Sequence, residues 1–486
     1  MRASIRFYLG SELHEIGEVS PNTTLLDWLR LDQRRVGSKE GCAEGDCGAC
    51  TIVVGRLRDG MVRYEAINSC IRPLLSLDGC HILTVEHLKA PDGSLHPVQH
   101  AMVDLHASQC GFCTPGFVMS LFAMYLEGAP PDMQRIEDAL AGNLCRCTGY
   151  RPIVDAALHV LNTPRQEGIV RDMGVRLAAL QDRQDIAIEH SSGVYRAPVD
   201  CDGLADILSQ HPGAVMVAGA TDVAHRITKT LERFPLLVDL GRISALREVT
   251  ADEEHICFGA MADLQTVRAN LGTIHPHLDE VMRRFGSEQI RNAGTIGGNI
   301  ANGSPIGDLP PVLIALGAHL TLRSKAGRRE MPLEAFFLEY RKQDRKPGEY
   351  LEAIKVPRLP AGALLHVSKI SKRFDEDISS VCGAFRIVLG ADARITEARL
   401  AFGGMAGIPK RAAHAEAALT GSVWSESAAM QAAVELEKDF QPLTDMRASA
   451  RYRMTVAKNL LRRFALETTQ GVPARVAGPL KAVAHA

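Results

Sequence analysis

Eight of the twelve cysteines in this 486-residue chain fall in two ordered sets near its start. The first set has C-x4-C-x2-C spacing followed by one distant cysteine, and consists of Cys42, Cys47, Cys50 and Cys70. The second set is two close pairs, Cys110 with Cys113 and Cys145 with Cys147. Four thiolates at the first spacing are the usual ligands of a plant-type [2Fe–2S] cluster. Two complete sets predict two clusters and therefore electron transfer.

Zinc and disulfide bonds are the alternatives for these cysteines. Zinc also accepts four thiolates, and for the second set alone it competes well because C-x-C is a weak pattern. The first loop, residues 41–50, interleaves glycine and alanine, so its N–H groups can turn towards bridging sulfides, which zinc does not need. Because the second set occurs in the same chain as this loop, an iron–sulfur cluster is the favoured interpretation for the second set too. A disulfide framework fits poorly with a long chain whose cysteines lie so close together.

Two glycine-rich segments in the second half could hold a phosphate group. They are residues 217–223 and residues 295–308. Closely spaced glycines let successive N–H groups converge on phosphate oxygens. Neither segment matches the G-x-G-x-x-G fingerprint or the P-loop, and either alone could be a turn without a ligand. Beside two clusters they favour a flavin dinucleotide, which can split a two-electron transfer into single steps.

Length and composition indicate how many domains the chain has and which partners and cellular locations to expect. A chain of 486 residues is too long for one core and predicts several domains. The formal net charge of −2 gives no reason to expect nucleic acid or an anionic membrane as partner. The first residues lack the apolar core of a secretory signal, and no apolar run is long enough for a membrane span. We therefore expect a cytoplasmic protein.

Periodicity predicts the elements that position the cysteines. Alternation predicts strands at 3–8, 14–19, about 50–57, 61–67 and 81–85, with a helix at 23–31. This pattern is typical of a β-grasp ferredoxin module with the first set at its edge. From 96 to 161 the pattern is helical, with helices starting at Thr114 and covering 133–141 and 151–162. Each pair of the second set therefore precedes a helix.

The second half predicts a different, α+β organisation. Strands are expected near 214–218, 236–240, 255–259 and 318–323, then at 381–389 and 394–402, with helices from 410 to 468. The tail after Gly471 has no periodicity. We divide the chain into domains at 1–88, 89–163, 193–362 and 363–470, with residues 164–192 as a charged, partly helical linker.

Four strings resemble the molybdenum hydroxylases, namely residues 41–50, 109–116, 143–150 and 295–308. The resemblance runs nearly end to end and is strongest to the small subunit of bacterial xanthine dehydrogenases. It implies a multidomain α+β fold made of a β-grasp [2Fe–2S] ferredoxin domain, a four-helix [2Fe–2S] domain, an α+β FAD-binding domain and a C-terminal α+β domain.

The resemblance also implies a function. A molybdopterin-binding large subunit would oxidise hypoxanthine and xanthine to urate in purine catabolism, within an (αβ)2 heterotetramer. Electrons would pass through two [2Fe–2S] clusters to FAD and then to NAD+. No region of this chain is expected to bind molybdenum, so hydroxylation would take place on the partner.

The family's site residues carry over by position. The first cysteine set would hold the cluster nearer the flavin. The second set would hold the cluster facing molybdenum. Gln109 and Cys147 would lie near the pterin of the molybdenum cofactor. The implied FAD contacts are Val217, Ala218, Gly219, Ala220, Thr221, Asp222, Val223, Thr295, Gly298, Asn299, Ser304, Asp308, Leu351 and Lys369. Phe285 would stack on the flavin, and Tyr340, Glu376, Gly404 and Met405 would surround the nicotinamide. Phe374 replaces an arginine of vertebrate relatives in a loop that influences the choice between NAD and oxygen.

Two other functions remain open. Another molybdenum hydroxylase, acting on an aldehyde or an N-heterocycle, would share all of these features because the substrate site lies on the partner. A non-catalytic iron–sulfur sensor or assembly factor would explain the cysteines but not the two glycine segments.

Overall fold

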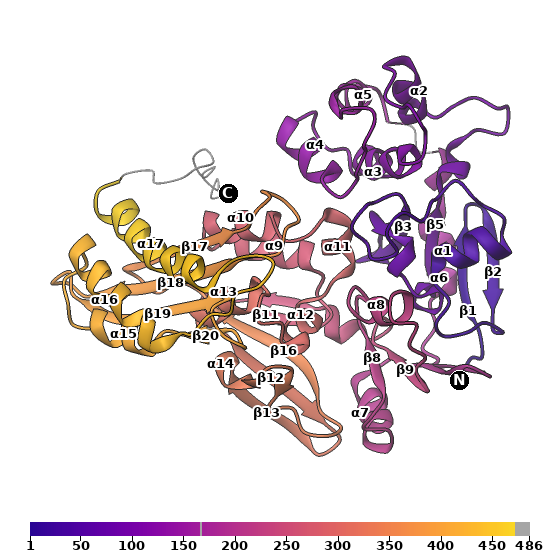
Figure 1. Ribbon diagram of the computed structural model, residues 1–486. Helices are drawn as coiled ribbons and strands as arrows, with labels where there is room; N and C mark the ends of the chain where they lie inside the picture. Colours follow the sequence, from indigo (N-terminus) through magenta and orange to yellow (C-terminus); the bar gives the residue numbers. More distant parts are fainter. Residues whose placement is uncertain (166–167, 472–486) are drawn as a thin grey trace. The chain divides into compact units, whose positions relative to one another are not determined.

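Residues 1–165 and 168–471 are described by the computed structural model, and their contacts form two units (Figure 1). The first unit contains Met1–Leu204, Gly213–Ser244 and Gly286–Gly294. The second contains Ala205–Pro212, Ala245–Phe285 and the described residues from Thr295 on. The predicted tail after Gly471 lies outside the described residues.

The first unit begins with a five-stranded sheet in the order β2-β1-β5-β3-β4. Its strands are β1 (Ile5–Leu9), β2 (Glu12–Ile16), β3 (Thr51–Arg58), β4 (Met61–Asn68) and β5 (Cys80–Leu83). All five predicted strands are confirmed to within a few residues. The predicted helix at 23–31 becomes one turn, α1 (Leu25–Asp27), capped by the Thr24 side chain. It widens into a π-helical turn at Trp28–Asp32. The predicted segment is therefore helical, but only its first turn is an α-helix.

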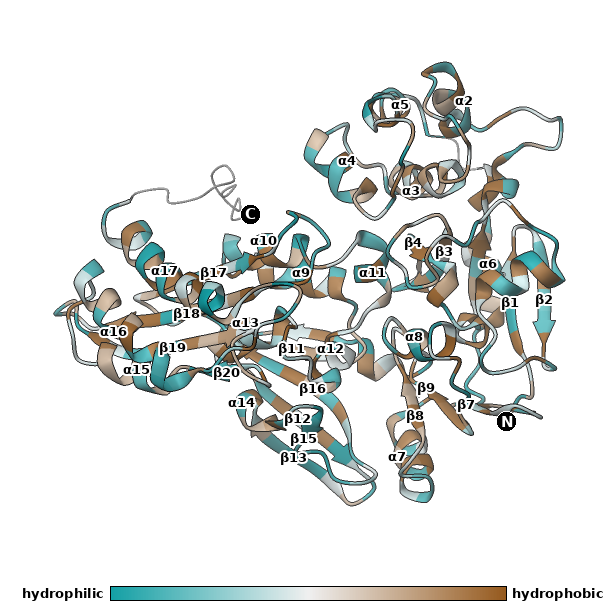
Figure 2. Cartoon of the chain, viewed as in Figure 1, coloured by the Kyte–Doolittle hydropathy of each residue, from teal (hydrophilic) through white to brown (hydrophobic). Residues whose placement is uncertain are grey.

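Four helices follow, as the sequence predicts: α2 (Pro97–Asp104), α3 (Thr114–Glu127), α4 (Met133–Leu140) and α5 (Arg151–Leu161). Pro115 lies in the first turn of α3, and Gly128 ends it with a left-handed φ of 72°. Figure 2 colours α3 mainly in the brown of apolar residues, and its residues from Gly116 to Leu126 are buried. Because α3 shares a core with residues of β3, β4 and β5, the helical domain is fixed to the ferredoxin sheet.

The rest of the first unit is a second sheet, in the order β6-β7-β9-β8. Its elements are α6 (Met173–Leu180), β6 (Ile186–His190), β7 (Gly193–Ala197), β8 (Val215–Val217), α8 (Val223–Thr228), β9 (Leu236–Asp239) and α11 (Glu288–Ala293), with α7 (Cys201–Gln210) following β7. The stretch 164–192, expected as a linker, thus contains a helix and ends in a strand. Ile186 and Ile188 of β6 are buried in a core shared with the ferredoxin sheet, which explains why a charged stretch is ordered.

The second unit has two main sheets, ordered β10-β11-β16-β12-β13 and β17-β18-β19-β20. The strands are β10 (Val249–Ala251), β11 (His255–Gly259), β12 (His319–Ser324), β13 (Gly327–Pro332), β14 (Phe337–Glu339), β15 (Lys342–Gln343), β16 (Tyr350–Pro357), β17 (Ala363–Ile370), β18 (Val381–Leu389), β19 (Ile395–Gly403) and β20 (Lys410–Arg411). The helices are α9 (Leu264–Gly272), α10 (Pro276–Arg283), α12 (Ile296–Asn302), α13 (Leu309–Leu316), α14 (Leu333–Phe336), α15 (Ala413–Leu419), α16 (Glu426–Asp439) and α17 (Ala450–Thr469). The predicted multidomain α+β fold is confirmed.

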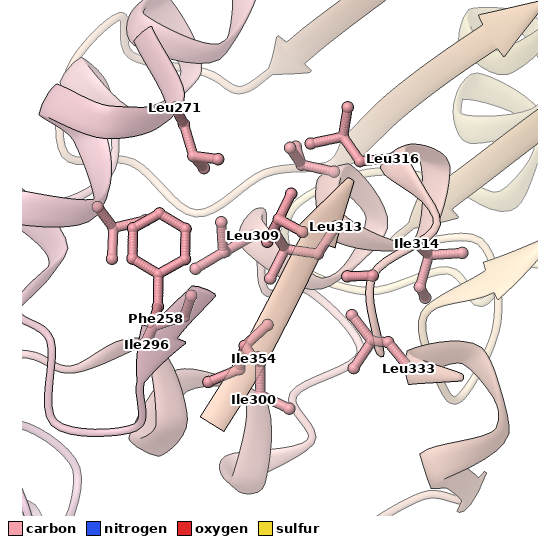
Figure 3. Close-up of a cluster of buried hydrophobic side chains, with 14 of the residues drawn as sticks. Phe258, Leu271, Ile296, Ile300, Leu309, Leu313, Ile314, Leu316, Leu333 and Ile354 are labelled. Carbon is pink, nitrogen blue, oxygen red and sulfur yellow. The ribbon is translucent and has the colours of Figure 1, made fainter. Parts of the chain in front are cut away.

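A core in the second unit anchors both ends of the second glycine segment (Figure 3). Ile296 and Ile300 of α12 are fully buried at its start. Helix α13, which follows directly, is apolar throughout and buried along its whole length. Each buried leucine or isoleucine stabilises the fold by roughly 1.5–3 kcal/mol. Residues 303–308 are therefore held between two fixed helices.

Candidate metal centres and cofactor loops

The first cysteine set comes together beside the ferredoxin sheet. Cys50 precedes β3 and Cys70 lies in a short turn after β4, and their sulfur atoms are 3.2 Å apart. Backbone N–H groups of Glu44 and Cys47 point at the Cys42 sulfur, at 3.5 and 3.4 Å. All four cysteines are free thiols, so the disulfide alternative does not apply to them.

The four thiols of this set shift one another's pKa values. Contact with the sulfur atoms of Cys47 and Cys70 lowers the pKa of Cys42, and contact with Cys70 lowers that of Cys50. The same contacts raise the pKa values of Cys47 and Cys70. A thiophilic metal centre would displace the thiol protons and keep all four groups as thiolates. The donor set thus fits an iron–sulfur cluster.

The second cysteine set also comes together, at helix ends. Cys113 caps α3, and Cys145 and Cys147 precede α5. The Cys147 sulfur lies 3.6 Å from that of Cys110 and 4.0 Å from that of Cys145. Burial and contact with Cys145 raise the pKa of Cys113 to about 12. Burial raises the pKa of Cys145 too, but hydrogen bonds from Thr148 outweigh it and lower the value to about 7.

Backbone contacts join the two cysteine loops. The N–H of Leu144 donates to the carbonyl of Cys47 at 3.0 Å. The side chain of Asn143 donates to the carbonyl of Gly48 at 3.1 Å. A Cβ at Gly48 would lie 2.0 Å from the carbonyl oxygen of Gly142, so only glycine permits this approach. The loops of the two sets are thus directly hydrogen-bonded to each other.

Helix α8 joins the first glycine segment to the first cysteine loop. It begins at Val223, where that segment ends. Its Thr228 hydroxyl donates to the Ala43 carbonyl at 2.7 Å, and Lys229 donates to the carbonyl of Cys42. The ring Nε2 of His225 is 2.9 Å from the Glu44 carbonyl. One short helix therefore ties residues 217–223 to residues 42–44.

The first glycine segment contains a strained turn. Ala220 has a left-handed φ of 65°, which costs free energy for a residue with a Cβ. A Cβ at Gly219 would lie 2.0 Å from the Ala293 carbonyl oxygen, so this glycine allows α11 to pack closely. Val217 is buried, whereas Asp222 is exposed. Such a strained turn fits a loop that wraps a phosphate group.

The second glycine segment lies in the second unit. Thr295 caps α12 by accepting the N–H of Gly298 at 3.1 Å. The buried Oδ1 of Asn299 has no hydrogen-bond partner among the described residues, so it is free to accept from a ligand. The segment ends in a buried ion pair between Asp308 Oδ2 and Lys369 Nζ, 2.5 Å apart, and Ser379 donates to the other carboxylate oxygen at 2.5 Å. These groups fit a flavin-binding segment.

The remaining predicted flavin residues differ in exposure. Phe285 is half-buried against the core of the second unit. Leu351 faces that same core from β16 and is buried. Ser304 is partly exposed. Residues 217–223 and 295–308 belong to different units.

One predicted nicotinamide residue, Gly404, lies beside the second glycine segment. The N–H of Gly404 donates to the Pro305 carbonyl at 2.8 Å. A Cβ at Gly407 would lie 3.9 Å from that of Tyr340, which is 59% exposed and open to a ligand. Met405 is fully buried in a core, so it can offer only its backbone.

Glu376 and Phe374 lie on the loop between β17 and β18. Glu376 has a left-handed φ of 56°. The Phe374 ring lies under the guanidinium of Arg284, 4.3 Å from its centroid, and the Phe374 carbonyl accepts from the same side chain at 2.9 Å. Arg284 also donates to the Lys369 carbonyl at 3.1 Å. The phenylalanine that departs from the vertebrate pattern thus holds this loop to the residue before Phe285.

A further group of potential metal ligands lies in the second unit. Ligand atoms of His277, His366 and Glu467 are within 4.8 Å of one another. His366 places Nδ1 2.9 Å from Glu467 and Nε2 2.8 Å from Ser368. Burial raises the pKa of Glu467, but hydrogen bonding to His366 outweighs it and lowers the value to about 2. A hydrogen-bonded pair explains these contacts without a metal.

Several residues that shape these sites carry no motif. His225 and Thr228 of α8, and Lys229 directly after it, reach the cysteine loop only through tertiary packing. Asn143 lies within a cysteine string, yet nothing in that string gives it a role. Gln289, fully buried between the two cysteine loops, has no sequence signal at all.

Family comparisons match three segments of the chain. Residues 84–158 match a [2Fe-2S] binding domain. Residues 188–359 match the FAD binding domain in molybdopterin dehydrogenase, and residues 366–468 match the CO dehydrogenase flavoprotein C-terminal domain.

Two similar proteins are much longer than this chain. Xanthine dehydrogenase of Emericella nidulans is 32% identical, over 97% of this chain and 39% of its own length. Xanthine dehydrogenase/oxidase of Rattus norvegicus is 31% identical, over 93% of this chain and 38% of its own length. The chain therefore spans about two fifths of these relatives.

Solved structures resemble just over half of the chain. The carbon monoxide dehydrogenase chain from Hydrogenophaga pseudoflava has a TM-score of 0.53 and 28% identity, covering 57% of this chain and 96% of that one. A chain of quinoline 2-oxidoreductase from Pseudomonas putida 86 has a TM-score of 0.52 and 27% identity, with 57% and 96% covered. Within residues 1–165 and 168–471, no helix is both long and apolar enough to cross a membrane.

Proposed function

Since the chain belongs to the molybdenum hydroxylase family, whose iron–sulfur and FAD-binding domains it carries, we propose that it is the electron-transfer part of a xanthine dehydrogenase. Its partner is a molybdopterin-binding large subunit in an (αβ)2 heterotetramer, and its acceptor is NAD+. When bound, two [2Fe–2S] clusters and FAD supply the one-electron and two-electron transfers, while the protein positions them.

The order of the loops in the first unit carries this proposal. Helix α8 ties the glycine segment 217–223 to Cys42 and its neighbours. The Leu144-to-Cys47 hydrogen bond then ties that loop to the second cysteine set. A relay needs its cofactors in such a sequence. A zinc protein or a sensor does not need hydrogen bonds between a flavin-binding loop and the first cysteine loop, or between the two cysteine loops.

The exposure of the second set supports a partner at that side. Cys110 and Cys147 are exposed, as is Gln109 next to them. Phe112, Leu144 and Tyr150, all more than two fifths exposed, add apolar surface from the same loops. Apolar side chains around an open metal site fit a docking face for a second polypeptide. In this proposal the second set receives electrons from the molybdenum centre of the large subunit.

The residues of the second unit supply the flavin and nicotinamide contacts in this proposal. Thr295, Asn299 and Asp308 would hold FAD, with Lys369 neutralising the buried Asp308. Phe285 would stack on the isoalloxazine. Tyr340 and Glu376 would orient the nicotinamide ring.

A second candidate is another molybdenum hydroxylase. Its support is the likeness of 57% of this chain to chains of carbon monoxide dehydrogenase and quinoline 2-oxidoreductase, at nearly the same identity as the curated relatives. The xanthine dehydrogenases match a larger share of this chain, 97% and 93%, and so favour the first candidate.

Turnover by the complex tests the proposal. Co-expressed with its large subunit, the protein should reduce NAD+ with xanthine or hypoxanthine. The chain alone, loaded with clusters and FAD, should oxidise NADH with an artificial acceptor but should not oxidise xanthine. NAD+ reduction with an aldehyde or an N-heterocycle, and none with purines, would favour the second candidate.

A further inference from the structure

Residues 286–294 pack with the first unit although the chain before and after them belongs to the second. This segment forms α11 and runs between Phe285 and Thr295, two of the residues we assign to FAD. Ser287 caps α11 by accepting the N–H of Ile290 at 3.2 Å. The chain thus leaves the second unit after Phe285, forms α11 in the first unit, which contains both cysteine sets, and returns to the second unit at Thr295.

Side chains at both ends of α11 fasten it within that unit. Glu288 accepts two hydrogen bonds from Arg135 of α4, at 2.6 and 3.1 Å. Such a two-point arginine–carboxylate pair fixes orientation as well as distance. Asn292 donates to the Ala66 carbonyl on β4 at 3.0 Å. The helix is therefore fixed to both the helical domain and the ferredoxin sheet.

Gln289 lies between these two anchors and has no exposed surface. Its Nε2 is 3.3 Å from the Thr51 hydroxyl, 3.2 Å from the Ser120 hydroxyl and 3.0 Å from Asn143 Oδ1. Thr51 follows Cys50 in the chain, and Asn143 stands two residues before Cys145. One amide group therefore reaches a residue beside each cysteine set.

The network continues into the cysteine loops. Thr51 and Asn143 both donate to the carbonyl of Gly48, at 2.7 and 3.1 Å. Gly48 stands between Cys47 and Cys50. A Cβ at Gly116 would lie 2.2 Å from the same carbonyl oxygen, and one at Gly142 would lie 2.3 Å from Gln289 Oε1. The backbones at Gly48 and Gly116 are therefore in close contact, and the backbone at Gly142 lies against the side-chain amide of Gln289.

We infer that Gln289 is a positioning residue that sets the separation and orientation of the two cysteine loops, and so the electron transfer between their clusters. The inference rests on the proposed function. The buried Nε2 of Gln289 joins three polar side chains in the low-dielectric interior, where hydrogen bonds are strong and stabilise one arrangement of the groups that they connect. Without the amide, Thr51, Ser120 and Asn143 lose their common donor, and the two loops can shift relative to each other.

The test replaces Gln289 by methionine, which has a similar length but no hydrogen bonds, in the full chain loaded with clusters and FAD. Gln134→Met is the matched control, because among the described residues the side chain of Gln134 hydrogen-bonds Asp138 alone, on its own helix α4. Ser120→Ala, which removes one of the three partners, provides a milder variant if Gln289→Met folds poorly. The measurements are the magnetic splitting between the two reduced clusters and the rate at which NADH reduces the second cluster.

Gln289→Met should keep both cluster signals, change the splitting between them and slow the reduction of the second cluster by NADH, because the separation and orientation of the two loops change. Ser120→Ala should shift both quantities less, and Gln134→Met should shift neither. Reduction of FAD itself should stay unchanged in all three variants. Unchanged splitting and rate in Gln289→Met and Ser120→Ala would overturn the inference alone. A wild-type protein with fewer than two cluster signals would overturn the proposed function, and this inference with it.

Discussion

The two cysteine sets differ in how the protein surrounds them. In the first set, Cys50 and Cys70 are buried, and α8 and the Asn143 loop contact its backbone from two sides. In the second set, Cys110 and Cys147 are exposed and exposed apolar side chains stand beside them. One set is enclosed by its own chain, while the other is open on one side.

This difference indicates different tasks. An enclosed centre exchanges electrons only with neighbours that its own chain provides. An open centre surrounded by apolar residues suits exchange with another polypeptide. The predictions below change one set at a time and compare the outcome with the other.

The largest effect is expected from removing a ligand of either set. Cys47→Ser should abolish the paramagnetic signal of the first cluster in the reduced protein and leave that of the second, because the sets occupy separate loops. Cys110→Ser should do the reverse. Iron content should fall by about half in each variant, as expected for [2Fe–2S] clusters held by separate ligand sets. Loss of both signals from a folded variant would show that the sets form a single centre.

A charge at the open side should disrupt the complex. Leu144→Glu places a carboxylate on the exposed apolar surface beside the second set. We expect it to weaken binding of the large subunit by about 2 kcal/mol or more, the scale of an interface hot spot. Native mass measurement and titration of the subunits measure this. Val175→Glu is the control, because Val175 is 77% exposed in the first unit and lies on α6, outside both cysteine loops. Equal weakening by both substitutions would contradict a docking face at the second set.

A smaller effect is expected where α8 contacts the first loop. Lys229→Met removes a cation that bonds the Cys42 carbonyl and pairs with Glu44 at 3.2 Å. Because the lysine is about two fifths exposed, the loss should be only about 0.2–1 kcal/mol in stability. The signal and midpoint potential of the first cluster should shift, while those of the second should not. Lys438→Met, at an exposed pair with Glu435, should leave both clusters unchanged.

The smallest effect concerns acid sensitivity of the enclosed set. Glu86 accepts hydrogen bonds from the N–H of Gly37 at 2.8 Å and from the Thr84 hydroxyl at 2.6 Å. Gly37 lies just before the first cysteine loop. Burial raises its pKa, but these hydrogen bonds outweigh burial and lower it below the ordinary 4.5. The ionised form therefore stabilises the fold above that pH, and the stabilisation is lost as the pH falls below it.

Glu86→Gln should reduce the urea midpoint of the ferredoxin domain at neutral pH. The difference in urea midpoint between the variant and the wild type should narrow as the pH falls below 4.5, where the wild-type carboxylate takes up its proton. A gap that widens on acidification would contradict the direction of the pKa shift.

Much of the fold could be predicted because its signals are local. Alternation located β3 and β4, and the threonine–proline pair located the start of α3 at Thr114. Cysteine spacing identified the ligand sets. The helix predicted at 23–31 shows the limit of such signals: Leu25, Leu26 and Leu29 are buried, but Leu31 is 64% exposed, and no pattern indicates the widened turn after Asp27. The strand β6 was hidden because its burial depends on the ferredoxin sheet.

The links between the sites could not be predicted. Lys229 and Thr228 read as an ordinary polar helix end until folding brings Cys42 and Ala43 beside them. Gln289 stands far from both cysteine sets in the sequence and reaches them only through the packing of α11. Motifs indicate what a loop can bind, whereas the order of the loops depends on contacts between distant residues.

Reduction of the two clusters by NADH in the Cys47→Ser and Cys110→Ser variants tests the central claim, that the first set stands between the flavin and the second set. Both variants are loaded with FAD, mixed rapidly with NADH and frozen for magnetic spectroscopy. With the second set disabled, the first cluster should be reduced as quickly as in the wild type. With the first set disabled, the second cluster should remain oxidised although FAD is reduced. Wild-type reduction of the second cluster in the Cys47→Ser variant would contradict the account.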